Sequence, residues 1–182
     1  WFMGICPTHP GFREYRLNQL AAFLDRYRVD GIWMDYLHWH AQFEDPDPIL
    51  PETCFCDRCV HRFERDTGLS VPADSTAARA HIILTDYEKE WRDWRCSVIE
   101  SWVHSIRKCV DEHQPGILLG CFHAPWTDED FDGARRRILG LDLRALAADV
   151  DVFSPMVYHA RMGRSPEWVG TTVSWLCSYL NA

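Results

Sequence analysis

The sequence predicts an α/β fold in which helices cover a parallel sheet. Three short apolar segments, at 29–35, 117–122 and 150–158, alternate with helix-forming segments along the 182 residues. Such alternation is typical of parallel sheets, because each crossover between parallel strands needs a covering helix. A complete eightfold barrel takes about 250 residues. We therefore expect residues 1–182 to be the central part of a single (β/α)8 TIM-barrel domain. An open doubly wound sheet is the alternative, and no Gly-rich phosphate loop follows a strand to favour it.

The first third of the chain predicts a strand tail, a helix and a buried strand. Residues 1–6 are expected to be the tail of a strand. Between residues 12 and 28, apolar side chains recur every three or four positions, which predicts an amphipathic helix. Residues 29–35 lack regular alternation of polar and apolar side chains. We expect this strand to be buried on both faces, as in a parallel sheet.

The middle of the chain predicts a loop followed by helices. Residues 38–53 are rich in proline and acid, which favours a loop, and a helix is expected from within the following cysteines to Thr67, where Gly68 ends it. A second, long helix is predicted over residues 76–113. Its apolar side chains step by three or four positions and form one stripe, which favours core packing: Tyr87, Trp91, Trp94, Val98, Trp102, Ile106 and Val110.

The last third predicts two further strand–helix units. A strand is expected at 117–122, then a short helix at 143–148 that begins after the capping residue Asp142. A third strand is expected at 150–158. Ser165 and Pro166 then open a final helix, because a capping residue followed by proline is typical of a helix start.

Composition limits the partners that the chain can have. The formal net charge is −8 with no long basic run, which argues against a nucleic-acid partner. No apolar run approaches about 20 residues, so no membrane span is predicted. Nine tryptophans are many for this length, and some would suit a groove that stacks sugars. The oligomeric state cannot be read from composition, and a cytoplasmic location is only the default expectation.

Three of the eight cysteines form a compact motif, Cys54-x-Cys56-x-x-Cys59. Thiolates at this spacing favour a tetrahedral Zn²⁺ site that pins a loop and does no chemistry. A fourth ligand is needed, for which Cys6 is the first candidate, His61 the second and His40 the third. The remaining cysteines lie in apolar contexts and are expected to behave as small hydrophobic side chains: Cys96, Cys109, Cys121 and Cys177.

Asp35 ends the apolar strand at 29–35 and is the first candidate for catalysis. His38 and Trp39 follow it closely, with Tyr36 and His40 beside them. In β/α barrels the chemistry lies at the C-terminal ends of the strands. A carboxylate there, among aromatic and imidazole groups, suits a nucleophile or general acid acting on a sugar. The alternative is that Asp35 caps a loop or pairs with an arginine.

Cleavage of a glycosidic bond needs a second carboxylate, from another strand end. Asp128, Glu129 and Asp130 follow the strand at 117–122 and are the visible candidates. The alternatives are that they form the solvated start of a helix, or that the partner lies outside this chain. The predicted sugar-binding side chains lie after the three strands: Trp39, His38, His123, Trp126, Tyr158 and His159.

These motifs together resemble a group of TIM-barrel glycoside hydrolases. The cysteine pattern, with Cys6-Pro7 before it, is similar to the zinc knuckle of the family 42 β-galactosidases, in which one earlier cysteine completes the site. The Asp30-Gly31-Ile32-Trp33-Met34-Asp35 strand resembles hypothetical glycosyl hydrolases related to the α-amylase and α-galactosidase type. In that group the Asp on the fourth strand is commonly the nucleophile. Family 42 enzymes carry an Asn-Glu pair where this chain has Met34-Asp35, so their acid/base is not carried over.

Residues and resemblance together predict a glycoside hydrolase that retains anomeric configuration, with Asp35 as nucleophile and a structural zinc. The first alternative is a non-catalytic carbohydrate-binding barrel that keeps the groove and the zinc. The second is a zinc-knuckle module that binds another macromolecule.

Overall fold

The computed structural model describes residues 4–181 and shows a mixed α/β fold around a three-stranded parallel sheet. The strands are β1 (Gly31–Met34), β2 (Leu118–His123) and β3 (Val152–Pro155), in the spatial order β1-β2-β3. Gly31 of β1 pairs with Leu118 of β2, and Gly120 of β2 pairs with Val152 of β3. The parallel sheet is as predicted, and within the described residues its three strands do not close into a barrel.

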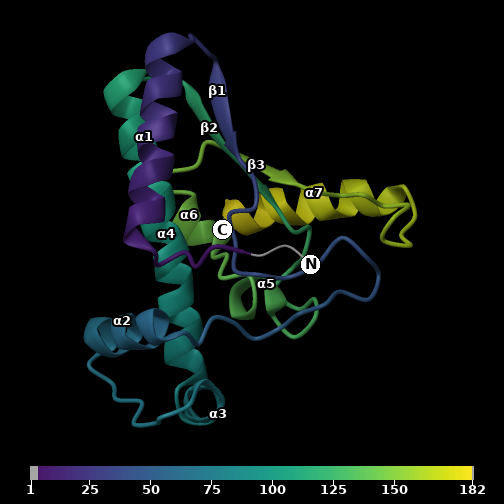
Figure 1. Cartoon of the computed structure of the whole chain (residues 1–182). Helices are drawn as coiled ribbons and strands as arrows, with labels where there is room; N and C mark the ends of the chain where they lie inside the picture. Colours follow the sequence, from purple (N-terminus) through teal and green to yellow (C-terminus); the bar gives the residue numbers. More distant parts are fainter. Residues whose placement is uncertain (1–3, 182) are drawn as a thin grey trace.

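Helices fill both crossovers and flank the sheet. The first crossover, from β1 to β2, carries three helices, and the second, from β2 to β3, carries two short ones. In Figure 1, α1 and the long α4 lie side by side along one face of the sheet, while α2 and α3 lie at the far end of α4. The helix bounds are α1 Pro10–Arg26, α2 Asp57–Thr67, α3 Thr76–Asp86, α4 Glu88–His113, α5 Ala134–Arg137, α6 Leu143–Leu146 and α7 Glu167–Leu180.

The strand predicted at 150–158 is shorter than expected, at Val152–Pro155, and the helix predicted at 143–148 is Leu143–Leu146. Three larger differences separate the predicted elements from the observed ones. The single helix predicted over 76–113 is wrong at Tyr87, whose φ of −132° and ψ of 25° end α3 and begin α4. The short helix α5 was not predicted. Of the expected N-terminal strand, residues 4–6 are not in a strand and residues 1–3 lie outside the described residues.

The aromatic stripe of α4 forms the core, as predicted. Trp91 and Trp94 stack with ring centroids 4.8 Å apart. Phe55 stacks on Trp91 at 5.3 Å, and Phe63 of α2 meets both tryptophans edge-on. The segment that carries the knuckle cysteines is therefore packed directly onto α4 by aromatic side chains. Among the described helices, none is long and apolar enough to cross a membrane.

The two faces of the sheet are covered unequally. On β2, Leu119 and Cys121 are fully buried on the helix side. On the other face, Trp33, Leu118 and Phe122 each expose more than a third of their surface. The indole of Trp33 lies against Gly120 and donates to Ser154 Oγ at 3.1 Å. The expectation that β1 is buried on both faces thus does not hold within residues 4–181, where one apolar face stays uncovered.

Candidate functional site

The structure brings Cys6 to the three knuckle cysteines. The four Sγ atoms of Cys6, Cys54, Cys56 and Cys59 all lie within 4.8 Å of one another. Cys6 Sγ lies 3.3 Å from Cys59 Sγ and 4.0 Å from Cys56 Sγ. Tetrahedral Zn–S bonds would set sulfur atoms about 3.8 Å apart, so the observed separations bracket that spacing. The donor set fits, and the cluster could hold a metal ion.

Local structure explains how the cluster forms. Cys6 lies in the turn before α1, and Cys56 is the N-cap of α2, which places Cys59 in the first turn of that helix. Thr8 Oγ1 lies 3.0 Å from Cys6 Sγ and 3.6 Å from Cys59 Sγ, on the protein side of the cluster. Hydrogen bonds with Cys54 and Cys59 lower the pKa of Cys6. Hydrogen bonds with Cys54 and Cys6, together with burial, raise the pKa of Cys59. The cluster thus favours a thiolate at Cys6, and thiolates are the form that binds metal.

A cavity of about 1050 Å³ joins the cluster to the end of β1. Its lining includes Tyr36, His38 and His40, which follow β1, and also Cys6 and Cys54. His38 Nδ1 lies 2.6 Å from the Trp39 carbonyl oxygen, while burial lowers the pKa of His38. His38 is therefore neutral at pH 7 and donates through Nδ1. Its Nε2 is buried without a hydrogen-bond partner among the described residues.

Asp35 follows β1 directly and is exposed. Side chains alternate along a strand, so Asp35 continues the face of Trp33, which the helices leave uncovered. Its carboxylate accepts a hydrogen bond from the Tyr36 backbone N–H at 2.8 Å. Tyr36 itself has a positive φ of 52°, which turns the chain sharply away from the sheet. The turn leaves the Asp35 carboxylate at the strand end, facing solvent.

The three acids after β2 have different surroundings. Asp128 is ion-paired with Arg135, whose side chain is fully buried. Asp130 accepts hydrogen bonds from the backbone N–H and the hydroxyl of Thr127, both at 2.7 Å. Glu129 is exposed and its carboxylate has no ion pair with any residue in 4–181. Asp128 and Asp130 thus stabilise their own loop, and Glu129 is the acid that projects most freely.

The predicted sugar-binding residues fall into two groups. Trp39, His123 and Trp126 are buried, with at most 4% of their surface exposed. Tyr158 is exposed and His159 is half-buried, and both line a separate hollow of about 550 Å³. Trp126 lines a third, smaller hollow of about 190 Å³ with Phe131. Trp39 and His38 both contribute to the large cavity, whereas His123 borders none of the three.

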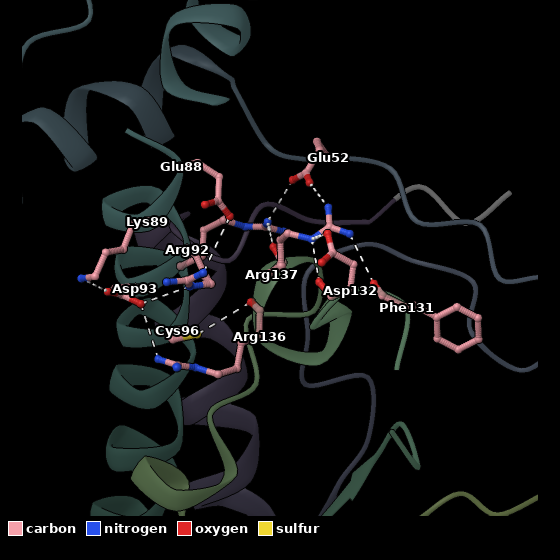
Figure 2. A network of polar contacts seen from close by, with 11 residues as sticks. Glu52, Glu88, Lys89, Arg92, Asp93, Cys96, Phe131, Asp132, Arg136 and Arg137 are labelled. Atoms are coloured by element: carbon pink, nitrogen blue, oxygen red, sulfur yellow. Dashed lines mark hydrogen bonds and ion pairs between the residues drawn. The ribbon is translucent and has the colours of Figure 1, made fainter. Parts of the chain in front are cut away.

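An ionic network that the sequence did not predict joins the half-buried Glu52 and Arg137 to the buried Arg95 beside the cluster (Figure 2). Glu52, two residues before Cys54, pairs with Arg137 at 2.7 Å and with Arg95 at 3.6 Å. Arg95 is fully buried, and burial lowers its pKa to about 10, so it stays charged at pH 7. Glu52 lies in a loop, whereas Arg95 and Arg137 lie on helices that are far from it in the sequence. Because these residues form no local pattern, the sequence alone could not predict the network.

Comparison with protein-family models finds no match, and no curated protein matches the chain. Among solved structures, the chain is similar to the PgaB (BpsB) glycoside hydrolase domain from Bordetella bronchiseptica. The TM-score is 0.70 over 98% of this chain, with 13% sequence identity. The chain covers 48% of that structure, so it spans about half the length of the structure that it matches. The likeness shows that the two share a fold.

Proposed function

We propose that this chain is part of a (β/α)8 barrel that hydrolyses glycosidic bonds in a carbohydrate. The observation that carries the proposal is the fold shared by 98% of the chain with a domain described as a glycoside hydrolase. The candidate acids follow the C-terminal ends of β1 and β2, which is where barrel enzymes carry their active sites. The uncovered apolar face at Trp33, Leu118 and Phe122 supports the barrel, because further strands would bury it.

In the proposed retaining mechanism Asp35 is the nucleophile. Its carboxylate attacks the anomeric carbon and forms a glycosyl ester while a second acid protonates the departing oxygen. That second group then takes a proton from the water that hydrolyses the ester. Glu129 is our first candidate for it, since Asp128 is held by the buried Arg135. The exposure of Asp35 supports its role, because an ionised carboxylate with free lone pairs is needed for attack.

The sugar contacts follow from exposure. Tyr158 and His159 offer polar atoms at the surface of their hollow, and we propose that they bind sugar hydroxyl groups. His38 lines the large cavity with its ring while Nδ1 is bonded and Nε2 is buried, so we propose that it contacts the sugar through the ring. Trp39 and Trp126 lie deeper and line two of the hollows, and we propose that they form walls against which the ring packs. His123 borders none of the hollows, so we assign it no direct sugar contact.

We propose that the cysteine cluster holds a structural Zn²⁺. Cys6, Cys54, Cys56 and Cys59 supply four sulfur ligands, which fill a tetrahedral site and leave no open position for substrate or water. Zinc bound there would cross-link the turn before α1 to the start of α2. No step of the proposed hydrolysis passes through it.

A non-catalytic carbohydrate-binding barrel is the second candidate. The engagement of Asp128 and Asp130 within their own loop favours it, because only Glu129 is then left as a partner for Asp35. Such a protein would bind glycans in the same cavity without turning them over.

The test is hydrolysis of a panel of aryl glycosides and oligosaccharides by the intact protein and by Asp35→Asn. Asp30→Asn is the matched control, since Asp30 is an exposed acid immediately before the same strand, at its other end. We expect turnover to fall at least about a thousandfold in Asp35→Asn and to persist in Asp30→Asn. Equal turnover in Asp35→Asn and the unmodified protein would remove Asp35 as nucleophile. Glycan binding without turnover in any of the three would favour the binding-only barrel.

A further inference from the structure

One carboxylate joins the segment of the cysteine cluster to two other elements (Figure 2). Glu52 Oε1 lies 2.7 Å from Arg137 Nη1 at the end of α5. Glu52 Oε2 lies 3.6 Å from Arg95 Nη1 on α4. Because Glu52 precedes Cys54 by only two residues, any arrangement that fixes Cys54 also restricts where this carboxylate can lie.

Arg137 in turn holds the strained part of the loop that carries the candidate acids. Its Nε donates to the Asp132 carbonyl oxygen at 3.1 Å, and its Nη2 donates to that of Phe131 at 3.4 Å. Phe131 and Asp132 have φ values of 51° and 57°, followed by Gly133 at 67°. Left-handed conformations at non-glycine residues are uncommon and persist when the surroundings fix them. The two hydrogen bonds from the Arg137 guanidinium fix the backbone of Phe131 and Asp132 in this conformation.

Arg95 connects Glu52 to the backbone at the end of α5. Its side chain is fully buried and donates to the carbonyl oxygens of Arg137 and Ile138, at 2.6 and 2.5 Å. It therefore fixes the backbone of Arg137 while Glu52 fixes the side chain. A buried guanidinium needs a charged partner, and Glu52 is the carboxylate that the described residues provide for Arg95.

We infer that Glu52 is a positioning residue that makes the Asp128–Gly133 turn depend on metal binding at the cysteine cluster. When a metal fixes Cys54, Glu52 is held in place, Arg137 stays extended, and Phe131 and Asp132 keep their left-handed conformations. When the cysteines are released, the segment of Glu52 loosens and the turn relaxes. The metal thus orders a loop that it does not touch. This inference rests on the proposed metal site and is independent of any catalytic role of the acids.

The test is hydrogen exchange of the intact protein, measured by mass spectrometry with Co²⁺ bound and after chelation. The thiolate-to-cobalt absorption band reports whether the cluster is occupied. We expect Co²⁺ to slow amide exchange over residues 131–138 by about fivefold or more, the lower end of typical coupling between sites. In Glu52→Gln the absorption band should persist while the slowing over 131–138 disappears.

Two further variants make the result decisive. Glu88→Gln is the matched control, because Glu88 pairs with Arg92 at 3.8 Å on α4 and makes no contact with Arg137. It should behave like the unmodified protein. Arg137→Lys keeps the charge but gathers its donors on a single nitrogen. It cannot replace the three separate nitrogens of Arg137 that bind Glu52, Phe131 and Asp132, so it should uncouple the turn even if Glu52→Gln fails to fold.

Each outcome has one meaning. Absence of the cobalt band in the unmodified protein would overturn both the metal site and this inference. A cobalt band with no slowing over 131–138 would overturn the inference alone. Slowing that survives in Glu52→Gln or in Arg137→Lys would overturn it as well.

Discussion

The cysteine cluster and the candidate acids after β1 and β2 have different surroundings. We call the region of these acids, Asp35, Asp128 and Glu129, the carboxylate edge. The four sulfur atoms contact one another, and Cys59 is fully buried. The candidate acids Asp35, Asp128 and Glu129 are exposed, and of the three only Asp128 has an ion pair with a described residue. The cysteines are thus packed within the protein, whereas the acids face solvent, as the proposed hydrolase would require. Mutations in the two regions should therefore change different observables.

The largest stability effect is expected from breaking the cluster at Cys59. Cys59→Ser replaces a fully buried sulfur that we propose to bind the metal, so loss of the proposed metal binding should appear as lost stability. We expect a decrease of about 3 kcal/mol or more in the free energy of unfolding. Urea unfolding checks the stability, and metal analysis of the purified protein checks occupancy.

Cys177→Ser is the control, since Cys177 is an exposed cysteine on α7. Its stability and metal content should match the unmodified protein. If Cys59→Ser retained a full equivalent of metal, the proposal that all four cysteines bind it and stabilise the fold would be wrong.

The second effect concerns His123, which is buried beneath the carboxylate edge. Burial lowers its pKa to about 4, against the opposing hydrogen bond with the Ala124 carbonyl. Between pH 6.5 and pH 4 the unfolded chain therefore binds more protons than the folded one, so stability is present above pH 6.5 and is lost as the pH falls. The loss between pH 7 and pH 5 from this group is about 2 kcal/mol.

Urea unfolding at the two pH values measures this loss. His123→Gln cannot take up the proton, so its stability should change less between pH 7 and pH 5. His61→Gln, at an exposed histidine of α2, should keep the full pH dependence. An unchanged pH dependence in His123→Gln would contradict a lowered pKa of His123 in the folded protein.

A smaller effect is expected in the sheet that supports both regions. A Cβ on Gly120 would overlap the indole of Trp33, so Gly120→Ala should displace that ring at a cost of about 1–2 kcal/mol. Gly170 on α7 has no atom near its Cβ position, and Gly170→Ala should stabilise the helix slightly. Thermal unfolding compares the two substitutions. Equal shifts in melting temperature would mean that Trp33 does not depend on Gly120.

The smallest effect is expected at the rim of the large cavity, by which we mean Arg161 and its partners Glu44 and Asp45. Arg161 pairs with Glu44 at 2.6 Å and with Asp45 at 3.6 Å, but 55% of its side chain is exposed. Solvent screens such pairs, so Arg161→Gln should change stability by less than about 1 kcal/mol. The difference from the unmodified protein should be smaller in 1 M than in 0.05 M NaCl, because added salt screens exposed charges further. A large loss of stability in Arg161→Gln would mean that these exposed ion pairs contribute as much to stability as the cysteine cluster.

Much of the fold could be predicted because its signals are local. The helix expected at 12–28 is α1 at Pro10–Arg26, and all three strands lie where apolar runs placed them. The break at Tyr87 could not be predicted, because the apolar stripe continues through it without a change of spacing. The uncovered face at Trp33 could not be predicted either, since an apolar run looks the same whether or not something covers it.

The candidate site divides in the same way. Cys54, Cys56 and Cys59 are close in sequence, so their spacing alone predicted a cluster, and Cys6 was chosen from three candidate ligands. Glu52 and Arg137 are 85 positions apart. Their pairing depends on how α4 and α5 pack, which no local pattern encodes. The positions of the acids after β1 and β2 followed from strand ends, but their different partners did not.

The most direct test of the account measures turnover and stability together, in one protein, after two separate changes. Removing the metal should lower the melting temperature while Asp35 remains in place, and Asp35→Asn should leave the melting temperature unchanged. With a glycoside that the intact protein hydrolyses, we predict that Asp35→Asn abolishes turnover. The metal-free protein, below its melting temperature, should keep measurable turnover, reduced only as far as the turn at residues 128–133 loses its order. Turnover that persists in Asp35→Asn, or that vanishes on metal removal while the protein stays folded and residues 131–138 stay ordered, would contradict the assignment of chemistry to the carboxylate edge and of structure to the cluster.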